Sequence, residues 1–406
     1  MSRHALDLAL LAVPLALVAA AVAAAPTATA DPALVQGNNA FGWDLYAQLR
    51  AKAGNRFCSP FSVSTALAMT SAGAKGQTLD EMAKTLHLPP GTDAAHAGFG
   101  ALLKQLQADP VKRGFELSVA NALWGQQGLP FRKEFLDLTQ KQYGAGLNTV
   151  DFHNPEQARQ TINQWVERQT KDRIKDLFAP GSLQGSTGLV LTNAIYFKGR
   201  WKQKFEEKAT APQPFHLGGG RDVPAPLMHR AGRFAYFAGD NLQAVELPYA
   251  GGDVSMVVLL LPKSADGLTA LEQSLDAATV DRWLGRLQST PGDVYLPRFK
   301  VTDEFDLTQT LQDMGMRAAF TGRADFSGML TTEPLSIGKV VHKAFVEANE
   351  EGTTAAAATG VAMARAAAPL HEDRFTFRAD HPFVFLIRDA KSGSVLFVGR
   401  VANPVG

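Results

Sequence analysis

The segment that decides the fold of this chain reads Glu350-Glu351-Gly352-Thr353-Thr354-Ala355-Ala356-Ala357-Ala358-Thr359. Alanine and glycine carry almost no apolar area to bury, so these residues have little with which to anchor a loop to a core. Small side chains can instead enter the space between other elements without overpacking it. The preceding residues, 340–349, are rich in types that favour strands. We therefore predict a strand that continues into a segment able to become a further strand if a slot opens in a sheet.

The composition is that of a globular chain with no preference for nucleic acid. Its 406 residues are 46% hydrophobic, which is enough to bury a large core, and its formal net charge is +1. The sequence has no basic cluster with interleaved aromatic residues, so we expect no nucleic-acid partner. No linker, charge block or fixed-period repeat divides it. We expect a single domain over residues 31–406 that functions as a monomer.

Residues 1–30 have the pattern of a secretory signal peptide. Arg3 precedes an apolar run over 6–25, and Ala28-Thr29-Ala30 provides a small-x-small cleavage site. The run is long enough for a membrane anchor, but Pro14 and the high alanine content favour cleavage. We expect a secreted protein, extracellular or periplasmic, with no membrane contact after processing.

Cys58 is the single cysteine of the sequence, so no disulfide can form within the chain. It lies between Phe57 and Ser59, in a setting typical of a small core residue rather than of a nucleophile. Export without disulfides means that stability has to come from the core itself.

The order of the predicted elements favours an α+β fold, with helices early and strands late. Ser59-Pro60 is typical of a helix start, and the nearly uncharged helix that follows should be buried on most sides. Residues 188–197 are apolar throughout, which favours a central strand buried on both faces. The other elements that matter below are a strand with one covered face (115–124), an amphipathic helix across a sheet (155–170), a strand (294–301) and a C-terminal hairpin (381–388 with 394–401).

Four stretches resemble the patterns of one protein family, and they follow one another in the order found there. They are Ser59-Pro60-Phe61-Ser62 with Gly73-Ala74-Lys75-Gly76; TNAIYFKGRW at 192–201; residues 341–359; and DHPFVFLIR at 380–388 with FVGRVANP at 397–404. On these motifs the chain resembles the serpins, serine protease inhibitors of the suicide-substrate type, and in particular a secreted member of the bacterial type. The resemblance begins near Gln36. It implies three β-sheets with about nine helices and an exposed reactive-centre loop.

The resemblance also implies a mechanism. A protease that attacks the loop forms an acyl-enzyme, and insertion of the loop into the main sheet as an extra strand traps that complex. Gly352 would act as the pivot and Thr353 would be the first residue to enter the sheet. Side chains at 355–358 that face the body are small enough for rapid entry. The implied partner is a serine protease held as a covalent acyl complex, and the chain itself is not an enzyme.

By the same resemblance, an opening cluster lies beneath and beside the strands that must separate. Its members are Ser59, Ser62, Asn193, His342, Trp201 and Arg298. A buried histidine is more often a satisfied core residue than a functional one, but here the cluster would both satisfy buried groups and control the strands. Glu350 matches a position that pairs with a basic residue near the top of the sheet, with Arg298 as the candidate; the alternative is two solvated charges.

The scissile bond is inferred by counting along the loop. In the family it usually lies seventeen residues along from the first hinge glutamate, which gives Ala366-Ala367. Alanine at this position suits an elastase-like protease with a small specificity pocket. Arg365, one residue earlier, would suit a trypsin-like protease, and Met363 is the third alternative.

Other functions compete with inhibition of serine proteases. A serpin fold that serves as a carrier or chaperone would have bulky, charged or proline residues in the hinge, and residues 352–359 have none. Inhibition of cysteine proteases stays open, because the trap needs only an acyl intermediate. A secreted hydrolase would need a motif such as Gly-x-Ser-x-Gly or His-Glu-x-x-His, and the sequence has neither. We therefore expect no catalytic residues, no cofactor and no metal.

Overall fold

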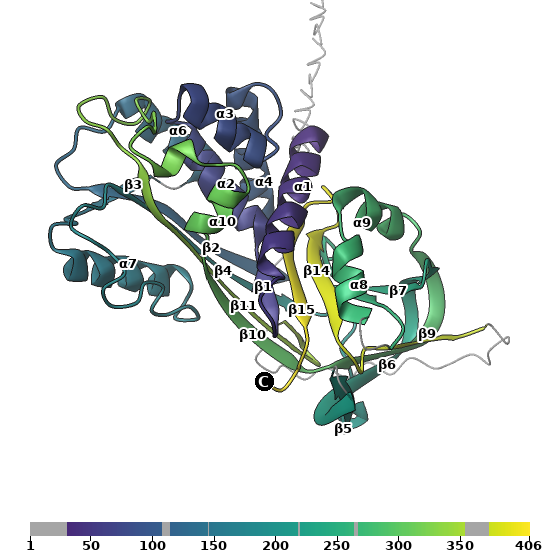
Figure 1. Cartoon of the computed structure of the whole chain (residues 1–406). Coiled ribbons are helices and arrows are strands. Elements are labelled where there is room, and N and C mark those ends of the chain that lie inside the picture. The colour runs from purple at the N-terminus through teal and green to yellow at the C-terminus, as the bar shows by residue number, and fades with distance from the viewer. Residues whose placement is uncertain (1–30, 108–113, 145, 218–219, 264–266, 354–372) are drawn as a thin grey trace, which may run out of the picture.

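The computed structural model describes residues 31–107, 114–144, 146–217, 220–263, 267–353 and 373–406 (Figure 1). These ranges contain nine α-helices and two short 3-10 helices, consistent with the α+β serpin fold predicted from the sequence. The helices are α1 (Pro32–Leu49), α2 (Pro60–Ser71), α3 (Gly76–Thr85), α4 (Thr92–Gln107), α6 (Lys133–Tyr143), α7 (Pro155–Gln169), α8 (Gly267–Ser274), α9 (Ala277–Leu284), α10 (Thr308–Asp313), η1 (Glu207–Ala209) and η3 (Ala318–Phe320).

Fifteen strands in the same ranges form two hydrogen-bonded networks. They are β1 (Arg56–Cys58), β2 (Phe115–Gln126), β3 (Leu147–Val150), β4 (Leu189–Arg200), β5 (Ala211–Leu217), β6 (Arg221–Gly239), β7 (Leu242–Pro248), β8 (Val254–Leu260), β9 (Gln288–Pro297), β10 (Phe299–Asp306), β11 (Ile337–Asn349), β12 (Gly352–Thr353), β13 (Phe375–Arg378), β14 (Phe383–Asp389) and β15 (Val395–Val401).

The six-stranded sheet is the part of the fold that positions the candidate site. Its order is β10-β11-β12-β4-β2-β3, and β11 also pairs directly with β4. Strands β4 and β11 are parallel, whereas β2 and β10 are antiparallel to their neighbours β4 and β11. A parallel pair of strands needs a long connection, and the chain between β4 and β11 provides one.

The nine-stranded network has two parts that share β6. Its order is β1-β15-β14-β8-β7-β6-β9-β13, with β5 also paired to β6. The start of β6 pairs with β5, its middle pairs with β9, and its end pairs with β7. Together with the six-stranded sheet, these two parts correspond to the three sheets implied by the resemblance. They are continuous because one long strand takes part in both.

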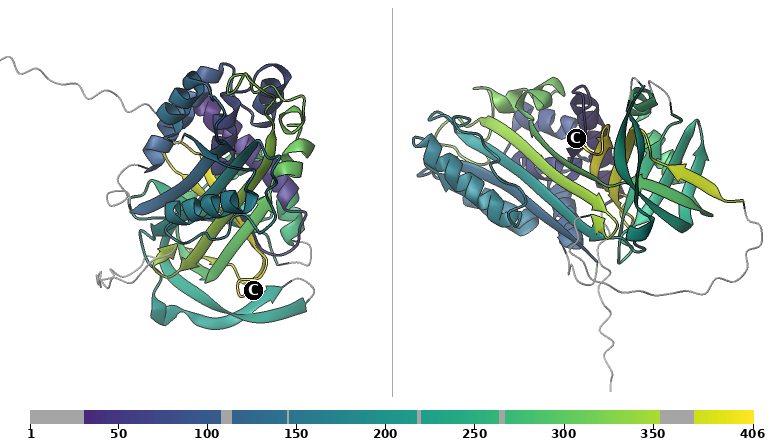
Figure 2. Two further views of the ribbon diagram at one scale, coloured as in Figure 1. Left: turned by 90° about the vertical axis from the view of Figure 1, so that its left-hand side faces the viewer. Right: turned by 90° about the horizontal axis from the view of Figure 1, so that it is seen from below.

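Helices cover the six-stranded sheet on both faces. The amphipathic helix α7 lies across one face, where Ala158, Ile162 and Val166 are buried against apolar residues of β2, β4 and β11 (Figure 2). Every residue of α2 is buried on the other face, between this sheet and the C-terminal hairpin β14–β15 (Figure 1). Ser59 caps α2 by accepting a hydrogen bond from the backbone N–H of Ser62 at 3.1 Å.

Two details of the predicted strands are wrong. The single strand expected over 294–301 is divided into β9 and β10, which belong to different networks and meet at Arg298. Strand-favouring residues run through the break, so their type alone could not locate it. The strand over 115–124 was expected to have one covered face, but residues 120–125 are buried without alternation because α2 and α7 pack on opposite faces.

Residues 1–30, which carry the predicted signal peptide, lie outside the described ranges. Among the helices that the structure does describe, none is both long and apolar enough to cross a membrane.

Candidate functional site

The start of the predicted insertion segment already lies in the six-stranded sheet. Strand β12 consists only of Gly352 and Thr353, and it pairs antiparallel with β11 on one side and with β4 on the other. On the β4 side, Gly352 is opposite Arg200 and Thr353 is opposite Gly199. The chain therefore turns back at Asn349 and enters the space between two strands that are otherwise direct neighbours.

Gly352 is required at this turn by both conformation and space. Its φ of +148° lies in a region that residues with a side chain rarely adopt. A Cβ atom here would lie 2.1 Å from the carbonyl oxygen of Gly199. No other residue type can bring the backbone this close to β4.

Thr353 is fully buried, with 0% of its surface exposed. Its hydroxyl lies 2.7 Å from the hydroxyl of Tyr249, and the Tyr249 ring stacks on Trp201 with centroids 4.6 Å apart. Burial raises the pKa of Tyr249, so its hydroxyl stays protonated. Either of the two hydroxyls can be the donor in the hydrogen bond between them. Tyr249 did not emerge from the sequence, because it comes from a turn region 104 positions away from Thr353.

Glu350 and Arg298 form an ion pair, not two solvated charges. The Nε of Arg298 donates to both carboxylate oxygens at 2.8 and 2.9 Å, and the hydroxyl of Thr210 donates to one of them at 2.5 Å. Burial alone would raise the pKa of Glu350, but these hydrogen bonds outweigh it and the pKa lies below its ordinary value. Glu350 is therefore a buried carboxylate at neutral pH.

Trp201 and its neighbours hold the backbone of the hinge. The indole N–H donates to the carbonyl of Asn349 at 2.8 Å, and the Trp201 backbone N–H donates to the carbonyl of Glu351 at 2.9 Å. The backbone N–H of Phe205 donates to the carbonyl of Glu350 at 3.0 Å. We call Trp201, Tyr249 and Arg298, with these bonds, the hinge clamp.

A second group lies lower in the sheet and forms a row across its strands. Asn121 on β2 is opposite Asn193 on β4, which is opposite His342 on β11, which is opposite Phe305 on β10. We call Asn121, Asn193 and His342 the polar row. The Phe305 ring stacks on His342 with an angle of 7° between the planes.

His342 closes the gap between β4 and β11. Its Nδ1 bonds to Asn193, and its Nε2 accepts a hydrogen bond from the backbone N–H of Ser59 at 3.0 Å. Because Nε2 accepts, the ring is neutral with its proton on Nδ1. Burial lowers the pKa of His342 to about 3, which agrees with a neutral ring.

Ser59 and Ser62 attach the polar row to α2. The Ser62 hydroxyl accepts from the Asn193 side-chain amide at 2.8 Å and donates to the Asn121 side-chain oxygen at 3.0 Å. The Ser59 hydroxyl donates to the carbonyl of Leu396 at 2.6 Å. Separation of β4 from β11 would break the bond between His342 and Asn193, and each of these two residues is also bonded to the start of α2.

The six residues predicted as one opening cluster thus divide between two places. Ser59, Ser62, Asn193 and His342 lie at the polar row, whereas Trp201 and Arg298 belong to the hinge clamp. Eight positions along β11 separate His342 from Glu350, or about 26 Å at the usual rise of a strand. The hinge clamp contacts the start of the predicted insertion segment, and the polar row lies across the strands between which that segment is predicted to insert.

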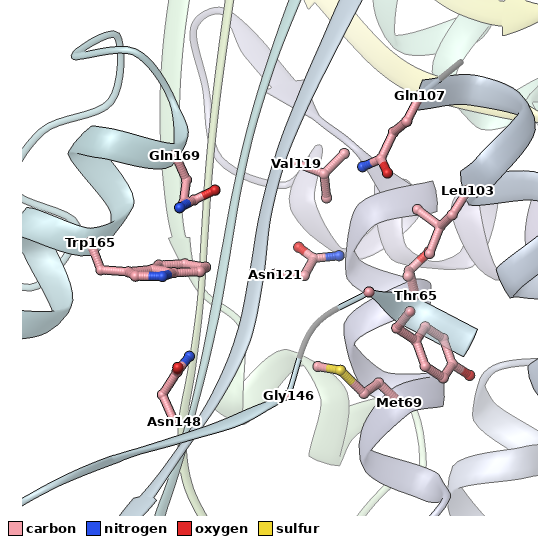
Figure 3. A pocket seen from close by; sticks show the side chains of 12 residues that line it. Thr65, Met69, Leu103, Gln107, Val119, Asn121, Gly146, Asn148, Trp165 and Gln169 are labelled. Atoms are coloured by element: carbon pink, nitrogen blue, oxygen red, sulfur yellow. The ribbon is translucent and has the colours of Figure 1, made fainter. Parts of the chain in front are cut away.

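A cavity of about 380 Å³ adjoins the polar row at β2 (Figure 3). Asn121 and Val119 point into it on the side of α2 and α4, while Trp165 and Gln169 approach from α7. The β2 end of the row is therefore less tightly packed than its middle, where Asn193 is 1% exposed.

Comparison with known families agrees with this architecture. A model of the serpin family, described as serine protease inhibitor, matches residues 36–404. The chain belongs to the serpin family.

Two sequence relatives of this serpin match most of its length. An uncharacterized serpin-like protein from Thermococcus kodakarensis is 42% identical over 91% of this chain and 86% of its own length. The human leukocyte elastase inhibitor is 42% identical over 91% of this chain and 99% of its own. Relatives of this kind support serine protease inhibition in general.

Solved structures of other serpins are similar in fold. Human thyroxine-binding globulin, in complex with thyroxine, superposes with a TM-score of 0.83 at 29% identity, covering 92% of this chain and 99% of its own. Uncleaved ovalbumin superposes with a TM-score of 0.81 at 30% identity, covering 92% of this chain and all of its own. These neighbours share the fold of this serpin.

Some predicted residues of this serpin lie outside the described ranges. They are Thr354, Ala355, Ala356, Ala357, Ala358 and Thr359 of the insertion segment, and Met363, Arg365, Ala366 and Ala367 near the scissile bond. Glu351 is described, and its carboxylate pairs with Lys204. Asn121 was missed from the sequence, although a polar residue among the apolar residues of a strand is a signal that could have identified it.

The buried His342 predicts that acid destabilises this serpin. The unfolded chain binds a proton at His342 below about pH 6.5, whereas the folded protein resists it down to about pH 3. Stability is therefore fully present above pH 6.5 and declines as the pH falls toward 3, by about 2 kcal/mol at pH 5. The amide of His342→Gln can donate and accept hydrogen bonds at the same places but does not titrate. This variant should therefore lose less stability than wild type between pH 7.5 and pH 5.

The measurement is the midpoint of the first guanidinium unfolding transition at pH 7.5 and pH 5 for both proteins. Equal shifts in wild type and His342→Gln would mean that His342 does not carry the pH dependence.

Proposed function

We propose that this serpin inhibits serine proteases by inserting its cleaved loop between β4 and β11. The observation that supports it best is β12: two residues already occupy that space, and Thr353 is buried there. The next residues along the chain are small, so they can follow without overpacking the sheet. Insertion would therefore lengthen β12, which is already paired with a strand on each side, and no new kind of strand pairing has to form.

The hydrogen-bonding pattern supplies a driving force for insertion. Residues 337–345 of β11 pair in parallel with residues 189–196 of β4. A strand inserted between them would be antiparallel to both, as β12 is. One parallel ladder would be exchanged for two antiparallel ladders, which are somewhat more stable per residue. The cost is the separation of the polar row and movement of α7, which covers the same strands.

The proposed inhibition depends on a competition between insertion of the loop and hydrolysis of the acyl-enzyme. The serine hydroxyl of the protease attacks the carbonyl of the scissile bond, the amine on the C-terminal side leaves, and an acyl ester joins protease and inhibitor. Water would normally hydrolyse the ester and release the protease. If insertion is faster than hydrolysis, the protease is carried along the sheet and its active site is distorted before the ester breaks.

We propose Ala366-Ala367 as the scissile bond and an elastase-like protease as the target, with Arg365 and a trypsin-like protease as the alternative. We also propose that residues 1–30 direct export and are removed, which would place the inhibitor outside the cell or in a periplasm. The seventeen-residue spacing supports the first proposal and the pattern of the leader supports the second.

Thr353→Arg should convert the inhibitor into a substrate. Thr353 is buried between β4 and β11, and an unpaired cation there costs several kcal/mol, roughly. Because about 1.4 kcal/mol changes a rate tenfold, insertion would slow by orders of magnitude. Cleavage chemistry takes place at the far end of the loop and should not slow. Because Thr353 already lies inside the sheet of the uncut protein, the arginine should also keep β12 out of the sheet, so that the variant loses the Tyr249 bond and melts below wild type while still folding.

Incubation with pancreatic elastase, read on denaturing gels, measures both outcomes. Wild type should give a covalent complex that survives SDS, and Thr353→Arg should give clean cleavage. Glu351→Arg is the matched control, since Glu351 makes only a surface pair with Lys204. Complex formation by Thr353→Arg at the wild-type ratio would contradict insertion as the mechanism, and clean cleavage of wild type would show a non-inhibitory serpin. The same gels with papain test inhibition of cysteine proteases.

The position of the scissile bond is tested by mass. Cleavage by pancreatic elastase should release a C-terminal fragment that begins at Ala367, because an alanine at 366 fits the small specificity pocket. Intact-mass measurement of the products decides this. A fragment beginning at Ala366 would move the bond to Arg365, and trypsin should then form the complex faster than elastase does.

A further inference from the structure

Strand β13 is the first described element after the reactive loop, and it lies at the edge of the nine-stranded network beside β9 (Figure 1). It has four residues, and among the described strands it pairs with β9 alone, from Gly292 to Tyr295. Such a short edge strand is held only weakly by its backbone. The attachment of β13 therefore depends on the side chains at its two ends.

The side chains at the C-terminal end of β13 gather around one carboxylate, that of Asp380. Arg378 donates from Nε to its Oδ2 at 2.9 Å, and Nδ1 of His381 is 2.9 Å from its Oδ1. On β5, Nε2 of His216 is 3.9 Å from Oδ2, and Nδ1 of the same ring is 2.8 Å from the carboxylate of Asp222 on β6. We call these five residues the β13 corner.

Asp380 is ionised at the centre of this corner. Burial would raise its pKa, but the hydrogen bonds from His381 and Arg378 outweigh burial, and the pKa lies below its ordinary value. The backbone carbonyl of Asp380 also accepts a hydrogen bond from the backbone N–H of His216 at 2.7 Å. The corner therefore ties the end of β13 to β5 through both side chains and backbone.

Both ring nitrogens of His381 face hydrogen-bond acceptors. Nδ1 faces the carboxylate of Asp380, and Nε2 is 2.8 Å from the carbonyl oxygen of Leu261, just after β8. A neutral imidazole can donate to one of these acceptors only, whereas an imidazolium donates to both. His216 likewise has a carboxylate near each ring nitrogen. The corner therefore has the geometry that suits two protonated histidines, and the His381 side chain is 14% exposed, so protons can exchange with solvent.

The N-terminal end of β13 is held differently. Arg374 donates to one carboxylate oxygen of Asp293 from Nε and Nη2 at 3.3 and 3.1 Å, and Nε2 of His229 is 2.9 Å from the other oxygen. A neutral imidazole can make this single bond. The C-terminal end is therefore the one whose bonds need doubly protonated rings.

The uncut loop can insert completely only if β13 detaches. Thr353 is opposite Gly199, so a strand continued in this register would place residue 363 opposite Leu189, ten positions further along each strand. Those ten residues cover about 33 Å, and the eleven residues from 364 to 374 span at most roughly 40 Å. They would have to return along the sheet and then cross to β13 in the other network (Figure 2).

We propose that the β13 corner is a pH-sensitive lock that keeps the uncut loop out of the six-stranded sheet. While His381 and His216 are protonated, they bind acceptors through both ring nitrogens and neutralise Asp380 and Asp222. Imidazoles lose this proton between about pH 5 and pH 8. Each neutral ring then donates from one nitrogen only, so the lock weakens as the pH rises. The inference rests on the proposed function, because it regulates insertion of the same loop.

Hydrogen exchange of the β13 amides tests the lock without any protease. Protection of residues 375–381, corrected for the intrinsic exchange rate, should be about tenfold lower at pH 8 than at pH 6. Tenfold corresponds to about 1.4 kcal/mol, the worth of about one hydrogen bond. The amides of β8 are the internal reference, since acid lowers global stability through His342 and acts in the opposite direction.

Two variants and a control assign the effect to the corner. His381→Gln does not titrate, so its β13 protection should be equal at the two pH values. Asp222→Asn removes the partner of His216 at a half-exposed side chain, which keeps the fold safe, and should give an intermediate ratio. His153→Gln is the matched control, because His153 also bonds to a carboxylate, Asp151, but precedes α7, and it should keep the wild-type ratio. A wild-type ratio in His381→Gln, or no ratio in wild type, would overturn the lock.

The consequence for the loop is measured on protein stored uncut at pH 6 and pH 8. Wild type should lose its capacity to form SDS-stable complexes with pancreatic elastase about tenfold faster at pH 8, and the inactive fraction should be uncut by mass yet melt higher. His381→Gln should lose capacity at the same rate at both pH values. A pH ratio in hydrogen exchange with none in this rate would overturn the link between the lock and the loop.

The two measurements fail separately. Fresh wild type that forms no complexes would remove the proposed inhibition, while the exchange ratio would still decide whether the corner responds to pH. Complexes at full yield with equal β13 protection at pH 6 and pH 8 would leave inhibition standing and remove the lock.

Discussion

Strands β4 and β11 run parallel as direct neighbours for most of their length, and at one end β12 separates them. The rest of the site depends on this fork. A polypeptide that enters this fork forms backbone hydrogen bonds with both neighbouring strands at once. Each residue that follows Thr353 would therefore lengthen two antiparallel ladders. Only small side chains can follow, because α2 and α7 pack on the two faces of the sheet.

The hinge clamp and the polar row act on opposite sides of this balance. The clamp favours entry: Trp201, Phe205 and Arg298 bind the hinge, and Tyr249 bonds to Thr353 inside the sheet. The row opposes it, because His342 and Asn193 bond directly across the interface that must open. The side chains of the polar row are neutral and have hydrogen-bond partners. Opening the row therefore breaks hydrogen bonds but leaves no charge unpaired. In the proposed mechanism, this balance leaves the uncut loop outside the sheet and lets the cut loop complete the strand.

Much of the fold could be predicted from the sequence, because the motifs that define it are local. The hinge composition, the Ser59-Pro60 helix start and the C-terminal hairpin each occupy one short stretch. The division of 294–301 at Arg298 could not be predicted, since strand-favouring residues run through the break. Asn121 and Tyr249 were missed for a different reason: their roles depend on register with Asn193 and contact with Thr353, far away in the chain.

The central claim is that complete insertion of the loop between β4 and β11 lowers the free energy of this protein and does not occur while the loop is intact. The most direct measurement is the melting temperature of the protein before and after a single cut in the loop, in the same buffer. We predict that cleavage raises it by well over the few degrees that a typical substitution causes. Identical melting curves for intact and cleaved protein would contradict the account.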